Sequence, residues 1–285
     1  MKSRLPVLAV AVLFVLAACT SSGAGSPAIS ATTATATAAT PSALTSAEAV
    51  ELTVYGAASL KSALDRAKSV YEAATPGTTL TISTDASSAL ETKIEQGAPV
   101  DVFLSADQAN PKKLVEAGLA DGAPVTFAGN KLIIVVPADN TAGITTPADL
   151  AKPGTKIIAA GDEVPISKYT RMLVTNLGKV AGYPTDFEAA YTANVASKED
   201  NVKALIAKIE LGEGDAGIVY VTDAKASTKI KTVDVPESAN VPATYDGVVV
   251  KGSANQDAAK AFLDWLASPD GQAILAKFGF LPAAS

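Results

Sequence analysis

Two periods of hydrophobic residues alternate along residues 50–280, and they predict strands that are followed by helices. Short apolar runs predict buried strands, the first three at Leu52 to Gly56, Leu80 to Ser83 and Val100 to Leu104. Apolar residues at helical spacing predict the helices between strands, and the first such stripe is Ala63, Leu64, Ala67, Val70, Tyr71 and Ala74. This β-α-β-α-β run predicts α/β architecture, with helices covering parallel strands.

The same alternation continues to the end of the chain. Further strands are expected at residues 131–136, 156–159, 218–221, 231–235 and 247–250, and further helices at 88–96, 167–180, 202–209, 258–267 and 272–277. Ser88-Ala-Leu-Glu91 has the spacing of a capping box at a helix start. Because the alternating part, about 235 residues, exceeds the usual size of one domain, we expect two lobes.

The first 49 residues have a different character. Lys2 and Arg4 precede an apolar run from Val7 to Leu16, which is typical of a signal peptide over residues 1–18 and too short to span a bilayer. Leu16-Ala-Ala-Cys19 resembles a lipobox and predicts lipidation of Cys19, the only cysteine, and hence an exported protein anchored to the extracytoplasmic (periplasmic) face of the membrane. Residues 19–49, rich in Ala, Thr and Ser, predict a disordered linker.

Composition excludes several classes of function. Without residues 1–18 the chain carries 21 basic and 29 acidic residues, a net charge of −8, which argues against nucleic acid as a partner. The chain has no histidine, so zinc, copper and haem sites and Ser-His or Cys-His nucleophiles lack their central residue. Ser-x-x-Lys and Gly-x-Ser-x-Gly are also missing. We therefore expect a monomeric binding protein without cofactor, not an enzyme.

Two segments invite a catalytic interpretation that their context does not favour. Gly212-Glu-Gly-Asp-Ala-Gly217 matches a dinucleotide-binding pattern, but it follows a predicted helix and precedes a predicted strand, so we interpret it as a helix stop and turn. Glu199 and Asp200 could form an acid/base pair, although beside a helix start they more simply offset its positive dipole end.

Hydroxyl and small residues recur where predicted strands give way to predicted helices. The four segments are residues 57–60, 85–89, 164–167 and 198–202. The first turn of a helix has unpaired N–H groups and a partial positive charge, so several such turns converging on one point would bind an anion without lysine or arginine.

At these segments the chain resembles the periplasmic molybdate-binding proteins of ABC transporters, with matching blocks over almost all of residues 51–281. The blocks are Val54-Tyr-Gly-Ala-Ala-Ser-Leu60, Ile94-Glu-Gln-Gly-Ala-Pro-Val-Asp-Val-Phe-Leu-Ser-Ala-Asp107, Gly129-Asn-Lys-Leu132, Glu199-Asp-Asn-Val202, Gly217-Ile-Val-Tyr-Val-Thr-Asp-Ala224 and Phe278-Gly-Phe280. The resemblance implies a type II periplasmic-binding-protein fold, with two mostly parallel sheets flanked by helices and joined by a hinge of crossing strands. Lobe 1 would comprise residues 50–130 and 238–285, and lobe 2 residues 131–237.

The same resemblance implies a ligand and a site. Molybdate or tungstate would be held between the lobes by the hydroxyls of Ser59, Ser87 and Tyr220 and the amides of Ile166 and Val202, with no direct protein–metal bond. The protein would then deliver the anion to an ABC permease. Such a dianion has only acceptor oxygens, so a site made of donors suits it.

Alternatives remain at this point. The solute could be sulfate, phosphate or an organic anion, or the chain could be a lipid-anchored sensor or enzyme on the same fold. Asp85 bears on the choice, because a carboxylate in the pocket could accept a proton from hydrogen phosphate and so favour it over molybdate. Alternatively, Asp85 points to solvent.

Overall fold

A computed structural model describes residues 49–283 of the chain. The predicted signal peptide, Cys19 and nearly all of the predicted linker lie outside the described residues. The described residues belong to one compact unit, which is presented below as two lobes. No helix within residues 49–283 is long and apolar enough to cross a membrane.

The first lobe is built on a five-stranded sheet with the order β2-β1-β3-β10-β4. Its strands are β1 (Val50–Ala57), β2 (Thr78–Asp85), β3 (Val102–Leu104), β4 (Ala120–Asn130) and β10 (Ala243–Val250). The strand β1 pairs in parallel with β2 and β3, whereas β10 is antiparallel to β3 and β4. The sheet is therefore mixed, but β10 alone runs against the other four strands, so the expectation of a mostly parallel sheet is confirmed.

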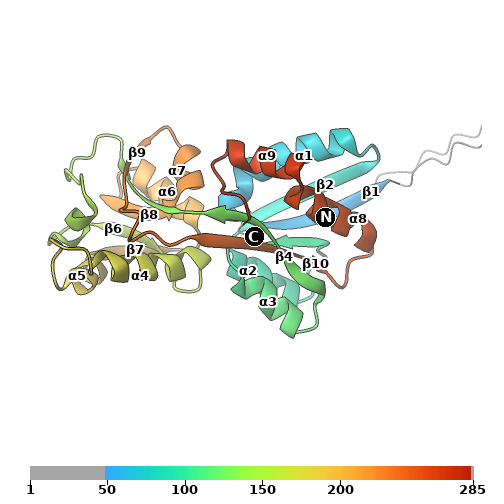
Figure 1. Ribbon diagram of the computed structural model, residues 1–285, viewed down its shortest axis with the longest axis horizontal. Helices are drawn as coiled ribbons and strands as arrows, with labels where there is room; N and C mark the ends of the chain where they lie inside the picture. Colours follow the sequence, from blue (N-terminus) through green and yellow to red (C-terminus); the bar gives the residue numbers. More distant parts are fainter. Residues whose placement is uncertain (1–48, 284–285) are drawn as a thin grey trace, which may run out of the picture. The chain divides into compact units, whose positions relative to one another are not determined.

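Helices cover both faces of the first sheet (Figure 1). One face carries α1 (Lys61–Ala74), α8 (Gln256–Ala267) and α9 (Pro269–Lys277), and the other carries α2 (Ser87–Glu95) and α3 (Ala109–Glu116). In β3, Val102 and Leu104 belong to one core cluster and Phe103 to the other. This two-sided burial explains the uninterrupted apolar run, since each fully buried side chain of this size contributes about 1.5–3 kcal/mol.

The second lobe repeats this arrangement with the order β7-β6-β8-β5-β9. The strand β6 is parallel to β7 and β8, and β5 is antiparallel to β8 and β9, so this sheet is also mixed. Helices α4 and α5 lie on one side of it, and α6 and α7 lie on the other (Figure 1). The bounds are β5 (Leu132–Pro137), β6 (Ile157–Ala160), β7 (Val195–Glu199), β8 (Ala216–Tyr220), β9 (Ile230–Val233), α4 (Pro165–Leu177), α5 (Phe187–Ala193), α6 (Val202–Glu210) and α7 (Val221–Lys225), with short 3-10 turns at Ala58–Leu60 (η1) and Pro147–Ala151 (η2).

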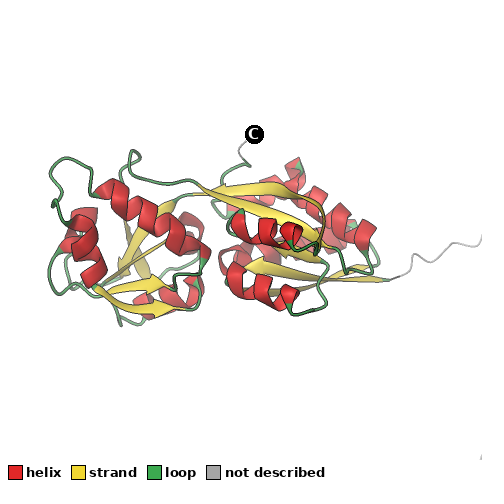
Figure 2. Ribbon diagram, turned by 90° about the horizontal axis from the view of Figure 1, so that it is seen from below, coloured by secondary structure: helices red, strands yellow, loops and turns green. Residues whose placement is uncertain are grey.

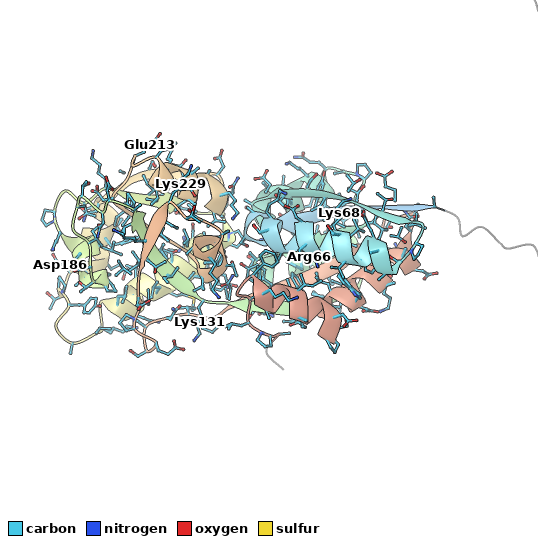
Figure 3. The ribbon with its side chains drawn as sticks, turned by 90° about the horizontal axis from the view of Figure 1, so that it is seen from above. Arg66, Lys68, Lys131, Asp186, Glu213 and Lys229 are labelled. Carbon is cyan, nitrogen blue, oxygen red and sulfur yellow. The ribbon has the colours of Figure 1, made fainter. Side chains whose placement is uncertain are left out.

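The chain passes between the two sheets twice (Figure 2). Lys131, labelled in Figure 3, alone separates β4 from β5, and the return lies between Val233 and Ala243. Asn240, on the return segment, accepts a hydrogen bond from the Leu132 amide at 3.1 Å and donates one to the Leu132 carbonyl at 2.8 Å. These two bonds tie the crossing segments together. The predicted lobe boundaries at residues 130/131 and 237/238 stay a prediction.

The hydrophobic pattern of the sequence predicts many of the strands and helices correctly. Each strand and helix predicted above is present, and Gly212 ends α6 in the left-handed region, with φ +71°, as the predicted helix stop requires. The capping box was wrong, because α2 begins at Ser87 with Ala86 before it, which places Ser88 inside the helix. The pattern missed α3, α5, α7, β4 and β7.

Candidate functional site

A small pocket lies where four strand-to-helix junctions meet, two from each lobe. It has about 220 Å³ of empty volume, open solvent included. The four junctions are β1 to η1 and β2 to α2 in the first lobe, and β6 to α4 and β7 to α6 in the second. The lining residues are Ala57, Ala58, Ser59, Asp85, Ala86, Ser87, Ala106, Val164, Pro165, Ile166, Asn201, Val202 and Tyr220. All five residues predicted from the sequence to bind ligand therefore line one pocket.

The two serines are buried, and each has a fixed neighbour in the protein. Ser59 lies in η1, and its hydroxyl is 2.9 Å from the hydroxyl of Tyr245 on β10. Ser87 is the first residue of α2, and its hydroxyl oxygen accepts a hydrogen bond from the Ala106 amide at 3.0 Å. Since Ser87 has a single hydroxyl proton and its oxygen already accepts, that proton remains available to a ligand.

Tyr220 contributes a hydroxyl for which the structure provides no partner. It is the last residue of β8, and its ring packs edge-on against Tyr169 and Tyr245, with centroids 6.4 and 5.7 Å away. The hydroxyl is buried without a hydrogen-bond partner among the described residues. Burial raises the pKa of Tyr220 well above its ordinary value of 10, so the hydroxyl keeps its proton and remains a donor. A buried donor of this kind requires an explanation, and a ligand that accepts from it supplies one.

Backbone amides at two helix starts complete the donor set. Pro165 is the first residue of α4 and Ile166 the second, so the Ile166 amide belongs to the turn that has no intrahelical acceptor. Asn201 caps α6, and its Oδ1 accepts from the amides of Lys203 and Ala204, both at 3.0 Å. This cap does not use the amide of Val202, the first residue of α6, which is left to a ligand.

Asp85 lines the pocket, but its carboxylate faces protein donors. Oδ1 accepts from the Ala86 amide at 2.8 Å and from the Asn201 side-chain amide at 3.1 Å, and Oδ2 lies 3.3 Å from Lys93 Nζ. The bond to Asn201 joins the first lobe to the second. Asp85 is therefore neither a free acceptor for a protonated ligand nor a side chain that points only to solvent.

The segments with a catalytic interpretation lie elsewhere. Glu199 pairs with Lys208, whose Nζ is 2.7 Å from Oε1, and neither Glu199 nor Asp200 is among the lining residues. No lysine or arginine is among them either, so within the described part of the chain the pocket is lined by hydroxyls, amides and apolar groups, with the carboxylate of Asp85 as its one charged group. Such a lining can bind an acceptor-rich solute, but it offers little acid or base for a reaction.

Sequence reasoning missed three polar residues that support the site. Asn201 was inside a quoted block, and its position before a helical stripe is a cap signal that could have found it. Asn130 was also inside a quoted block, but Asn130 and Tyr245 contact the site through neighbours 115 or more positions away in the sequence, and no helix or strand signal gives them this role.

Two mixed α/β lobes, joined by two crossing segments and enclosing a pocket of donors, define a solute-binding protein of the periplasmic type. Comparison with known families agrees. The family described as "Bacterial extracellular solute-binding protein" matches residues 52–281, and the chain belongs to this family.

Individual relatives share most of their length with this chain. The molybdate-binding protein ModA of Mycobacterium tuberculosis is 34% identical over 230 residues, which are 80% of this chain and 84% of that protein. YvgL of Bacillus subtilis, provisionally described as an ABC transporter substrate-binding lipoprotein, is 30% identical over 81% of this chain and 86% of its own length. A solved structure from Clostridium difficile, provisionally described as the substrate-binding domain of a molybdenum ABC transporter, is 33% identical with a TM-score of 0.62, and the match covers 82% of this chain and all of that one.

Proposed function

We propose that this chain captures a fully deprotonated tetrahedral oxyanion, molybdate or tungstate, through the hydroxyls of Ser59, Ser87 and Tyr220 and the amides of Ile166 and Val202. The observation that carries the proposal is the buried Tyr220 hydroxyl, which lines the pocket without a hydrogen-bond partner among the described residues. The choice of molybdate rests on the names of the relatives described above, and tungstate is included because it is also a tetrahedral dianion with only acceptor oxygens.

The chemistry of the lining supports a small anion without a proton. Charge-assisted hydrogen bonds contribute about 1.5–3 kcal/mol each, so five such donors suffice for micromolar or tighter binding after the costs of desolvation and closure. The starts of α2, α4 and α6 add the positive ends of three helix dipoles. An acidic protein with net charge −6 can therefore bind an anion without a countercharged side chain.

The proposal extends to the place of the protein in transport. The chain would be exported, lipidated at Cys19 and held at the membrane surface, and would deliver its anion as a monomer to an ABC permease. The family description as extracellular and the lipoprotein description of YvgL support this placement. Metal enters only as the centre of the oxyanion, so neither metal ligation nor turnover is involved.

Titration calorimetry tests the ligand assignment. The full chain, purified in mild detergent and freed of bound anions, is titrated with molybdate, tungstate, sulfate and phosphate in turn. We expect tight binding of molybdate and tungstate and much weaker binding of the other two. Tight binding of sulfate or phosphate without binding of molybdate would show that the ligand assignment is wrong.

A further inference from the structure

The hydroxyl of Ser59 stands at the end of a buried chain of hydrogen bonds that reaches the hinge. Tyr245 is fully buried, and its hydroxyl lies 2.9 Å from the Ser59 hydroxyl and 3.3 Å from the Asn130 side-chain nitrogen. Asn130 is the last residue of β4, immediately before the chain crosses to the second lobe. The chain thus connects a pocket hydroxyl to the segment that joins the lobes.

The orientation of the Asn130 amide is set by its other contacts. Its Oδ1 accepts from the Lys131 backbone amide at 3.0 Å, and its Nδ2 also donates to the Thr222 hydroxyl at 2.9 Å. An exchange of oxygen and nitrogen would bring two N–H donors together at Lys131. Asn130 therefore presents a donor, which cannot accept, to Tyr245.

This donor determines the direction of the next bond. Tyr245 accepts from Asn130 and has one proton left, and Ser59 is the only acceptor the described residues offer that proton. If Ser59 donated to Tyr245 instead, the Tyr245 proton would be buried without a partner, which is unfavourable. Donation therefore runs from Asn130 to Tyr245 and from Tyr245 to Ser59, and the Ser59 proton is left to face the pocket.

We propose that Asn130 and Tyr245 are positioning residues that hold Ser59 as a hydrogen-bond donor and so exclude oxyanions that carry a proton. The proposal rests on the proposed function and deepens it. Ser87 is held as a donor independently, by the amide of Ala106. With both serine oxygens already accepting from the protein, each serine points its proton at the anion, so a protonated anion such as hydrogen phosphate would set its own O–H against a donor at these two positions.

Asn130, Tyr245 and Ser59 form a hydrogen-bond relay, and a substitution that reverses the direction of donation along it tests the proposal. Asn130→Asp keeps the size of the side chain and the acceptor for Lys131, but it offers Tyr245 a carboxylate acceptor in place of the amide donor. Tyr245 then donates toward residue 130, and Ser59 turns a lone pair toward the anion. The hydrogen bond from Ser59 to the anion is then replaced by repulsion between the Ser59 oxygen and the anion. We therefore expect molybdate affinity to fall by more than about 100-fold, measured by calorimetry on the full chain at pH 8.

The double variant Asn130→Asp/Tyr245→Phe separates the relay from the added charge. Without the Tyr245 hydroxyl, Ser59 can again donate to the ligand, so affinity should recover at least about tenfold relative to Asn130→Asp. If the loss arises only from the negative charge, the double variant will bind as weakly as Asn130→Asp or more weakly, and the relay is refuted.

Tyr245→Phe alone gives a second readout that does not depend on the stability of Asn130→Asp. Ser59 becomes free to rotate and can accept from a protonated anion, so the ratio of molybdate to hydrogen phosphate affinity should narrow by about tenfold. Tyr169→Phe is the matched control: this buried tyrosine accepts from the Thr244 amide near the hinge and has no bond to Ser59. It should leave the ratio unchanged, and an equal change in both variants would contradict the proposal.

The outcomes distinguish the relay from the proposed function. If the unaltered chain does not bind molybdate, the ligand assignment fails. If it binds molybdate, and Ser59→Ala weakens binding, but Asn130→Asp and Tyr245→Phe leave affinity and selectivity unchanged, only the relay fails.

Discussion

Replacement of Tyr220 by phenylalanine should change stability and affinity in opposite directions. The variant removes one oxygen and keeps the ring, whose edge contacts with Tyr169 and Tyr245 hold it in place. In the protein without ligand the hydroxyl is buried and unpartnered, so its removal relieves a desolvation penalty of about 1–3 kcal/mol. Because 1 kcal/mol shifts the melting temperature of a protein of this size by about 2–4 °C, the variant should melt about 2–12 °C higher.

The same change should weaken ligand binding. Loss of a charge-assisted bond worth about 1.5–3 kcal/mol lowers molybdate affinity by about 10- to 150-fold. Ligand binding stabilises the native state in proportion to the logarithm of ligand concentration over Kd, so saturating molybdate should reduce or reverse the difference in melting temperature. The two curves of melting temperature against molybdate concentration should therefore converge or cross.

Scanning calorimetry with and without molybdate, combined with titration calorimetry, measures both effects. Tyr191→Phe is the matched control, because the Tyr191 hydroxyl is also buried without a partner but lines a different pocket, on the second lobe. This control should gain stability to a similar extent and bind molybdate as the unaltered chain does. Unchanged affinity in Tyr220→Phe would refute the assignment of Tyr220 as a ligand donor, and a lower melting temperature without ligand would refute the desolvation penalty of its hydroxyl.

Three further predictions concern other parts of the structure. Ser87→Ala should weaken molybdate binding by about 1–3 kcal/mol in a calorimetric titration, and unchanged affinity would place the ligand elsewhere. Asp85→Ala should weaken molybdate and phosphate by the same factor, about 2- to 10-fold, because the carboxylate bonds Asn201 rather than the ligand, and a selective loss of phosphate binding would contradict this. Burial alone would raise the pKa of Asp149, but hydrogen bonds from Lys152 and from the backbone amides of Thr145 and Thr146 outweigh it and hold this pKa well below its ordinary 3.8. A lowered pKa stabilises the native state above the unfolded value and loses that effect as pH falls, so Asp149→Asn should cost about 1–2 kcal/mol at pH 7, with a difference in denaturant unfolding that shrinks below pH 4. A difference independent of pH would refute this account.

Four of the strand-to-helix junctions at the pocket could be predicted from local sequence. A strand followed by small and hydroxyl residues and then a helical stripe identified four of the turns that line the pocket, including those of Ser59 and Ser87. The local pattern misplaced the start of α2. Ser88 has the spacing of a cap but lies within α2, because that helix begins one residue earlier, at Ser87.

The direction of strands and the boundary at Tyr220 also depend on distant residues. Whether β10 runs parallel or antiparallel to β3 depends on how the chain returns from the other lobe, which a hydrophobic run cannot encode. The predicted strand at 218–221 ends at Tyr220, and Val221 begins α7. Tyr220, at that boundary, lines the pocket.

The alternation of strands and helices, the predicted export signal and the donor-rich junctions could be predicted from local sequence, since they depend on residues close together in the chain, and the lack of histidine follows from composition alone. Only the tertiary structure decided which donors remain without a partner. The bond between Asp85 and Asn201 spans 116 positions, and that between Ser59 and Tyr245 spans 186. Whether a hydroxyl is satisfied or free depends on such distant neighbours, and binding by this protein depends on the hydroxyls and amides that folding leaves free.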